Sequence, residues 1–203
     1  ILSEDSLTVT FNTFSQATYP VGDYTLTYSF TMGATDEFTQ DDELVYNFRI
    51  DADKIALAEI DASGQTTNSG GIRPAESTQP FTSCIVYSDP NASRRSVKSI
   101  GFSASTSTVD GIELTGELME VIAYEWNDPI TSLDAVTVSD ITQVGFGEFF
   151  YAADDQNVTV YQDIETPFTM VDNQKYLFCV LLIGNIIVIL SKFITIFHFL
   201  FTN

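Results

Sequence analysis

The strict alternation of apolar and polar residues along several short segments is the feature that most constrains the fold of this chain. In the segment 24–31, Tyr, Leu or Phe takes every even position and Thr or Ser takes every odd one. Successive side chains of an extended strand point to opposite faces, so the pattern predicts a strand with one dry and one wet face. The same alternation recurs at Leu7, Val9 and Phe11 and again from Leu44 to Ile50.

Further strands are predicted at 55–60, 81–87, 97–103, 112–126, 142–151 and 157–162. Gly, Pro, Asn and Asp separate these segments at short intervals, as expected for tight turns. About nine such strands favour an all-β fold, an antiparallel β-sandwich or a jelly-roll-like arrangement, over residues 1–175. The long polar segment 61–79 has no apolar period, and we expect it to be a surface loop that carries recognition.

The segment 112–126 is long for one strand, and its alternation slips near Leu118 to Glu120. We therefore expect a bulge at that point, or two strands. A helix over 116–124 is the alternative.

Charge narrows the choice of partners. The chain of 203 residues has 28 acidic and 8 basic residues and a net charge of −20. Nucleic acid is an unsuitable partner, because phosphate backbones are bound through Lys and Arg. The acidity serves either solubility or the binding of divalent cations and basic partners.

Residues 176–203 form a hydrophobic C-terminal segment, in which the stretch 176–201 is long enough to cross a bilayer. A membrane helix is one interpretation. The alternatives are that the first residues, from Lys175 to Val180, form a last buried strand of the domain, or that the tail is a non-native product of a reading-frame slip.

The residue types leave little room for reaction chemistry. The one histidine, His198, lies in the apolar tail, so Ser-His-Asp and Cys-His arrangements and histidine zinc sites are excluded from the preceding domain. Cys84 and Cys179 are the only cysteines. They do not indicate a disulfide framework, and Cys84 is predicted to be a small buried apolar residue. We expect no enzyme; a glycosidase acting through Glu117, Glu120 and Glu125 is the remaining catalytic alternative.

Two sets of binding residues are candidates. Clustered carboxylates in or beside turns suit calcium, which takes six to eight oxygen ligands. These metal candidates are Asp41, Asp42, Asp51, Asp53, Asp154 and Asp155. Aromatic rings suit stacking on a sugar, although each could instead fill the core. These ligand candidates are Tyr87, Tyr124, Trp126 and Tyr161.

Three segments resemble known families. Gly22 to Phe30 resembles the opening strands of jelly-roll carbohydrate-binding modules. Met119-Glu-Val-Ile-Ala-Tyr-Glu-Trp-Asn-Asp, and the stretch from Thr166 to Val180, look like segments of β-sandwich virion and tail proteins of tailed phages. The resemblance implies a non-catalytic structural or receptor-facing protein of a phage particle, on the virion or tail surface, that assembles with other virion proteins and with copies of itself. The alternative is a membrane-anchored, cell-surface carbohydrate-binding or adhesive module with a glycan partner.

Overall fold

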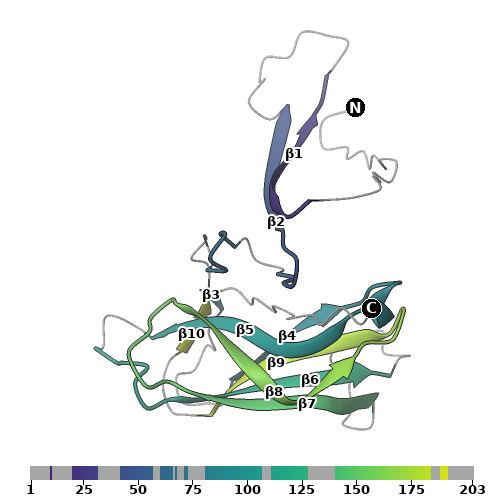
Figure 1. The fold of residues 1–203 in the computed structure, drawn as a ribbon. Coiled ribbons are helices and arrows are strands. Elements are labelled where there is room, and N and C mark those ends of the chain that lie inside the picture. Colours follow the sequence, from purple (N-terminus) through teal and green to yellow (C-terminus); the bar gives the residue numbers. More distant parts are fainter. Residues whose placement is uncertain are drawn as a thin grey trace, which may run out of the picture.

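The structure is a computed structural model, and it divides the chain into a β-sandwich and a separate hairpin (Figure 1). It describes residues 10, 20–31, 42–56, 60–65, 67, 71–72, 81–106, 111–127, 140–183 and 188–191. Every strand pairing is antiparallel, so the expected all-β antiparallel fold is confirmed.

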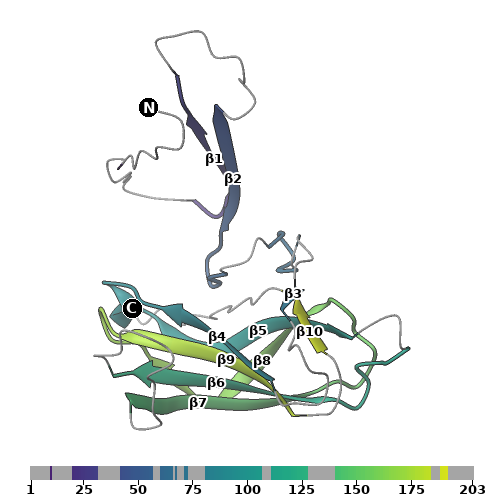
Figure 2. The ribbon, with the colours of Figure 1, turned by 180° about the vertical axis from the view of Figure 1, so that it is seen from behind.

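The sandwich consists of two four-stranded sheets packed face to face (Figures 1 and 2). One sheet has the order β3-β10-β5-β8, formed by β3 (Gly71–Ile72), β10 (Val188–Ser191), β5 (Ser96–Thr106) and β8 (Thr159–Thr169). The other has the order β4-β9-β6-β7, formed by β4 (Phe81–Tyr87), β9 (Lys175–Ile183), β6 (Leu118–Trp126) and β7 (Ile141–Phe150).

The core lies between the inner faces of these sheets. Alternate residues of β6 and β9 point into this core, as side chains of extended strands do. Phe102 of β5 meets Phe149 and Tyr151, at the end of β7, edge to face across the interface, with ring centroids 5.6 Å and 6.5 Å apart. These rings therefore connect the two sheets.

The edge strands β7 and β8 come close together along one side of the sandwich. Gly145 and Gly147 of β7 are both buried there. A Cβ atom at Gly147 would lie 2.5 Å from the backbone oxygen of Asp163 in β8, so only glycine fits at this approach. Pro167 falls in β8 where the register with β5 shifts, as expected for a proline on an edge strand.

Several expected boundaries are wrong. Residues 118–126 form one strand, so the alternative helix over 116–124 is wrong. The register shift of β6 falls between Ala123 and Tyr124 rather than near 118–120, because an extra residue of β7 is accommodated there. Residues 55 and 56 are not in a strand, and Ile60 makes only an isolated bridge. The predicted strand 7–11 and most of the loop 61–79 lie outside the described residues.

The described part of the C-terminal hydrophobic segment is strand. β9 begins at Lys175 and runs between β4 and β6, so a domain boundary at 175/176 would cut a central strand. Burial accounts for the apolar character of β9, because its inward residues Tyr176, Phe178, Val180 and Leu182 are all buried. In the part of the chain that the structure describes, no helix is long and apolar enough to cross a membrane.

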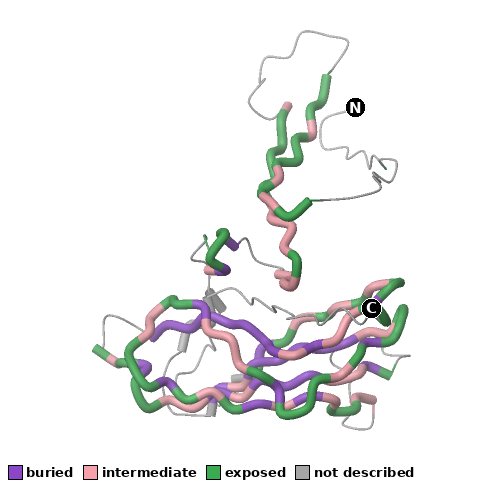
Figure 3. Tube along the Cα trace, in the orientation of Figure 1, coloured by how far each residue is buried: buried purple, intermediate pink, exposed green. Residues whose placement is uncertain are grey.

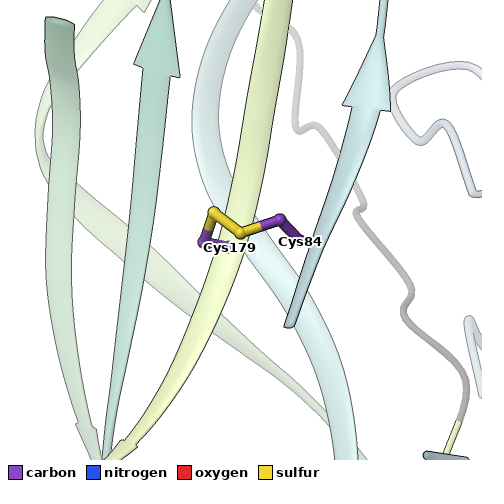
Figure 4. Close-up of a disulfide and its surroundings, with 2 residues drawn as sticks. All are labelled: Cys84 and Cys179. Carbon is purple, nitrogen blue, oxygen red and sulfur yellow. A yellow bond between two sulfur atoms is a disulfide. The ribbon is translucent and has the colours of Figure 1, made fainter. Parts of the chain in front are cut away.

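The two cysteines form a disulfide, contrary to expectation (Figure 4). Cys84 of β4 and Cys179 of β9 lie directly opposite each other in the antiparallel pair, although 95 positions separate them in sequence. Both point to the outer face of the sheet, where Cys84 is exposed and Cys179 is buried among apolar neighbours. The prediction that Cys84 is a buried apolar residue is therefore wrong, because residues 83, 85 and 87 are the inward-facing ones in β4.

A two-stranded hairpin stands away from the sandwich (Figures 1 and 2). It consists of β1 (Gly22–Ser29) and β2 (Glu43–Ile50), paired in register from Gly22–Ile50 to Ser29–Glu43. Neither strand has more than marginal contact with any sandwich strand that the structure describes. The strands themselves were predicted, but not their separation from the sandwich.

Candidate interaction surface

The hairpin places six of its apolar residues on one face. Directly opposed residues in an antiparallel pair share a face, so the pairs Tyr24–Phe48, Leu26–Tyr46 and Tyr28–Leu44 lie side by side. We call these six residues the apolar hairpin face. The rings of Tyr24 and Phe48 stack with centroids 5.5 Å apart, and those of Tyr46 and Phe48 at 6.2 Å.

Three of the six residues of this face, Leu26, Leu44 and Tyr46, are exposed to solvent. Leu44 is 61% exposed and Tyr46 is 56% exposed, and Figure 3 shows exposed residues along most of both strands. A hairpin of two strands is marginally stable by itself in water and usually needs a hydrophobic partner. An apolar hairpin face left open is therefore the strongest candidate for a docking surface among the described residues.

The opposite face of the hairpin is polar apart from Val45, and several of its side chains pair with one another. Arg49 donates to Asp23 across the strands at 2.7 Å, and Thr25 donates to the side-chain oxygen of Asn47 at 2.8 Å. Arg49 also approaches Asp51 at 3.5 Å, at the point where the chain leaves the hairpin. The charges of the hairpin strands therefore lie away from the apolar hairpin face.

A hollow of about 320 Å³ lies between the foot of the hairpin and the chain around residue 61. Both acidic and aromatic side chains contribute to its wall. Its lining residues are Asp23, Tyr24, Thr25, Asn47, Phe48, Ile60, Asp61, Ala62 and Thr67.

The segment below this hollow is a tight turn built on Asp61. Its carboxylate accepts hydrogen bonds from the backbone and hydroxyl of Ser63, at 2.8 Å and 2.6 Å, and from the backbone of Gln65 at 3.0 Å. These hydrogen bonds lower the pKa of Asp61, and the bond from the Ser63 hydroxyl has the largest effect. The turn is thus organised by its own side chains.

Tyr161 and Gln65 fasten this turn to β8. The Tyr161 hydroxyl donates to the carbonyl of Gly64 at 2.5 Å, and the Gln65 amide group exchanges two hydrogen bonds with the backbone of Thr159. Gly64 has a positive φ of 83°, and a Cβ atom there would lie 2.6 Å from the Tyr161 hydroxyl. Tyr161 therefore has a structural partner at its hydroxyl.

We expect Tyr161→Phe to reduce the alkaline sensitivity of folding. Burial first, and then the nearby carboxylates of Asp51, Asp61 and Asp53, raise the pKa of Tyr161 to about 12 in the folded chain. The unfolded chain loses the phenol proton near pH 10, so this group's contribution to stability is complete below pH 10 and declines between about pH 10 and 12.

Denaturant unfolding at intervals from pH 8 to 12 measures this effect. The phenylalanine variant should show a shallower decline above pH 10 than the parent chain, and a loss of about 1 kcal/mol at pH 8 from the missing hydrogen bond. An unchanged decline above pH 10 would contradict the assignment.

The metal candidates occupy separate places. Asp41 lies outside the described residues, Asp42 is at the tip end of β2, and Asp51 and Asp53 are at the foot of the hairpin. Asp154, in the segment between β7 and β8, accepts hydrogen bonds from the backbone of Leu114 and from the side chain of Gln156. Within the described ranges, no three His, Cys, Asp or Glu side chains gather closely enough to hold a metal ion.

The ligand candidates are also dispersed. Tyr87 points inward, and its hydroxyl donates to Asp89 at 3.2 Å and accepts from Arg95 at 2.7 Å. Tyr124 and Trp126 lie on the outer face of β6. Trp126 is only 8% exposed, with the Lys175 ammonium 5.6 Å from its ring centroid. Tyr161 belongs to the other sheet, so these residues do not form one binding face.

The carboxylates of the catalytic alternative do not converge either. Glu120 and Glu125 are an odd number of residues apart in β6, which places them on opposite faces of the sheet. Glu117 precedes the strand, and its backbone forms hydrogen bonds with Leu114 and Tyr151.

Comparison with known protein families finds no match to this chain, and comparison with curated proteins likewise finds none. The candidate surface therefore depends on its geometry alone. Sequence reasoning missed it, although the alternation in 24–30 and 44–50 already contained every residue of the apolar hairpin face.

Proposed function

We propose that this chain is a non-catalytic structural protein on the surface of a phage virion or tail. It acts by joining other proteins of the particle through the apolar hairpin face. The open, uncharged face of the projecting hairpin carries this proposal, because soluble proteins seldom leave such a surface uncovered in their working state.

The order of the strands supports a jelly roll as the specific form of the sandwich. Successive antiparallel strand pairs alternate between the two sheets, which have the orders β3-β10-β5-β8 and β4-β9-β6-β7. This is the order expected when two adjacent, antiparallel arms of the chain wind together around the sandwich. Jelly rolls of eight strands are a common form of viral capsid and lectin domains. By analogy at the level of the fold, this strand order favours a particle protein or a binding module over other classes.

The disulfide supports a location outside a reducing cytosol. Structural disulfides persist in secreted proteins and on virion and cell surfaces. A cross-strand bond between Cys84 and Cys179 suits a surface protein that must stay folded outside the cell.

Fractionation tests the proposed function. Particles released from cells that produce this chain are purified on a density gradient and washed in high salt. The chain is then quantified by mass spectrometry in the particle, membrane and soluble fractions. We expect several copies per particle in the particle fraction. Recovery in the membrane or soluble fraction, with none in the particles, would overturn the proposal.

A carbohydrate-binding or adhesive module is the second candidate, and the hollow at the foot of the hairpin favours it. About 320 Å³ is at the small end of ligand pockets. Aromatic residues such as Tyr24 and Phe48 can stack on a sugar ring, and carboxylates such as Asp23 and Asp61 can accept hydrogen bonds from its hydroxyl groups. Binding on a glycan array that is lost in Phe48→Ala would establish this candidate, and silence of the array with and without calcium would eliminate it.

A further inference from the structure

We infer that the Cys84–Cys179 disulfide is a modification site, at which a thiolate from outside the chain forms a mixed disulfide with Cys84 and releases Cys179 while the sandwich stays folded. This site goes beyond the proposed function and does not depend on it. It takes one chemical class of partner, a thiolate sulfur.

The two cysteines differ in their access to solvent. Cys179 is 1% exposed and lies in an apolar cluster with Ile122, Trp126 and Leu177, whereas Cys84 is exposed. Both lie on the outer face of the sheet, so the difference comes from their strands. β4 is an edge strand, and β9 lies between β4 and β6. A thiolate therefore reaches Cys84 without any opening of the sheet.

The direction of attack gives the same preference. A thiolate displaces the leaving sulfur in line, so it approaches from the side opposite the bond that breaks. This bond runs from β9 toward β4 (Figure 4), so attack on Cys84 comes from beyond the edge strand. Attack on Cys179 would come from the side of β6, where Ile122 is the directly opposed residue and is itself buried. The neighbouring strand therefore shields Cys179.

Exchange at Cys84 needs no oxidant other than the disulfide itself. The external thiolate forms a bond to Cys84 Sγ, the Sγ–Sγ bond breaks, and its electron pair passes to Cys179 Sγ, which takes a proton from water. The external thiol is oxidised, and Cys179 is reduced. Apolar surroundings disfavour the Cys179 thiolate and slow its departure. They do not redirect the attack, because the sulfur of Cys179 is the shielded one.

Backbone pairing holds the sandwich together after the exchange. β4 pairs with β9 in register from Phe81–Leu182 to Tyr87–Tyr176, and β9 also pairs with β6 from Lys175 to Ile183. The bond that breaks joins strands that these ladders already align. Cys84 can therefore carry an attached thiol group at the edge of a folded sandwich.

Exchange in the folded parent chain tests the inference. The full chain is exposed briefly to mercaptoethanol without denaturant and quenched with acid, and its free thiols are alkylated with a maleimide. Peptide mapping by mass spectrometry then locates both groups. We expect mercaptoethanol on Cys84 and the maleimide on Cys179, with the reverse pattern at least about tenfold rarer. The same treatment in urea is the control, and it should give the two patterns in comparable amounts.

A matched pair of variants measures access to each sulfur separately. Cys179→Ser leaves Cys84 as the one thiol of the chain, and Cys84→Ser leaves Cys179. Both variants lose the same bond, and far-UV circular dichroism shows whether each is folded. With an aromatic disulfide reagent, we expect Cys84 to react at least about tenfold faster than Cys179.

A disulfide that resists mercaptoethanol in the folded parent chain, under conditions where the denatured chain reacts completely, would overturn the inference. An adduct that forms mainly on Cys179 would also overturn it. Equal rates in the two folded variants would count against it in the same way, since they would show that the sheet does not shield Cys179. If the variants do not fold, the peptide map of the parent chain decides, because it needs no substitution.

Discussion

Phe102→Ala is expected to lower the free energy of unfolding by about 4 kcal/mol, which is a large share of the stability of a domain of this size. The Phe102 side chain is almost completely buried, and it contacts rings of Phe149 and Tyr151 from the facing sheet. Removing it deletes buried apolar surface and leaves a cavity between the sheets that their backbones cannot close. Two edge-to-face ring contacts are lost as well.

Phe150→Ala is the matched control for this prediction. It deletes the same atoms from a residue of β7 that is 60% exposed, so it should cost less than about 1 kcal/mol. Urea unfolding of both variants, followed by far-UV circular dichroism and tryptophan fluorescence, gives the comparison. Equal losses in the two variants would mean that the sheets do not meet at Phe102 as the structure has them.

Local sequence patterns could predict where most strands lie, but not how the strands are arranged. Strand patterns in the sequence identified β1, β2, β4, β5 and β7 to within a few residues, because a half-buried strand places apolar side chains at every second position. The predicted segment 112–126 begins six residues before β6, and the predicted segment 157–162 ends seven residues before the end of β8. The same alternation is produced by a strand of a sandwich and by a strand of a projecting hairpin. Separation of β1 and β2 from the sandwich therefore could not be predicted, since it depends on what lies across from their apolar faces.

Strand order was also beyond the reach of local patterns. β9 pairs with β4 and β6, which precede it by many residues, and only these pairings bring Cys84 opposite Cys179. The apolar character of 176–183 has two explanations from sequence, a membrane segment and a doubly buried strand, and hydropathy cannot distinguish them. Position between two strands decides this for the described residues of β9.

For the candidate site residues, too, the sequence could indicate residue types but not which side chains lie together. Residue types indicated acidic clusters and aromatic stacking groups, but oxygen ligands and rings form a site only if their side chains converge. Odd spacing placed Glu120 and Glu125 on opposite faces, and separate sheets hold Tyr124 and Tyr161. The apolar hairpin face, in contrast, consists of side chains at alternate positions of two strands that pair directly with each other, so they lie together.

Removing the disulfide is expected to cost about 4 kcal/mol, because a link between residues 95 positions apart restricts the unfolded chain strongly. The bond joins strands that are already paired along their length, so Cys84→Ala with Cys179→Ala should leave the folded structure nearly unchanged. The effect therefore falls mainly on the unfolded state, which becomes more expanded without the link. We expect the denaturant dependence of the unfolding free energy to become steeper as well as the midpoint to fall.

Chemical denaturation of the parent chain with and without a thiol reductant, beside the double alanine variant, measures this effect. The reductant should lower the midpoint of the parent chain toward that of the variant and should leave the variant unchanged. Because the expected loss approaches the total stability of a small domain, the reduced chain should unfold at a markedly lower temperature. A parent chain that is insensitive to reductant, with two thiols that react with a thiol reagent in the native state, would show that the strands β4 and β9 are not linked.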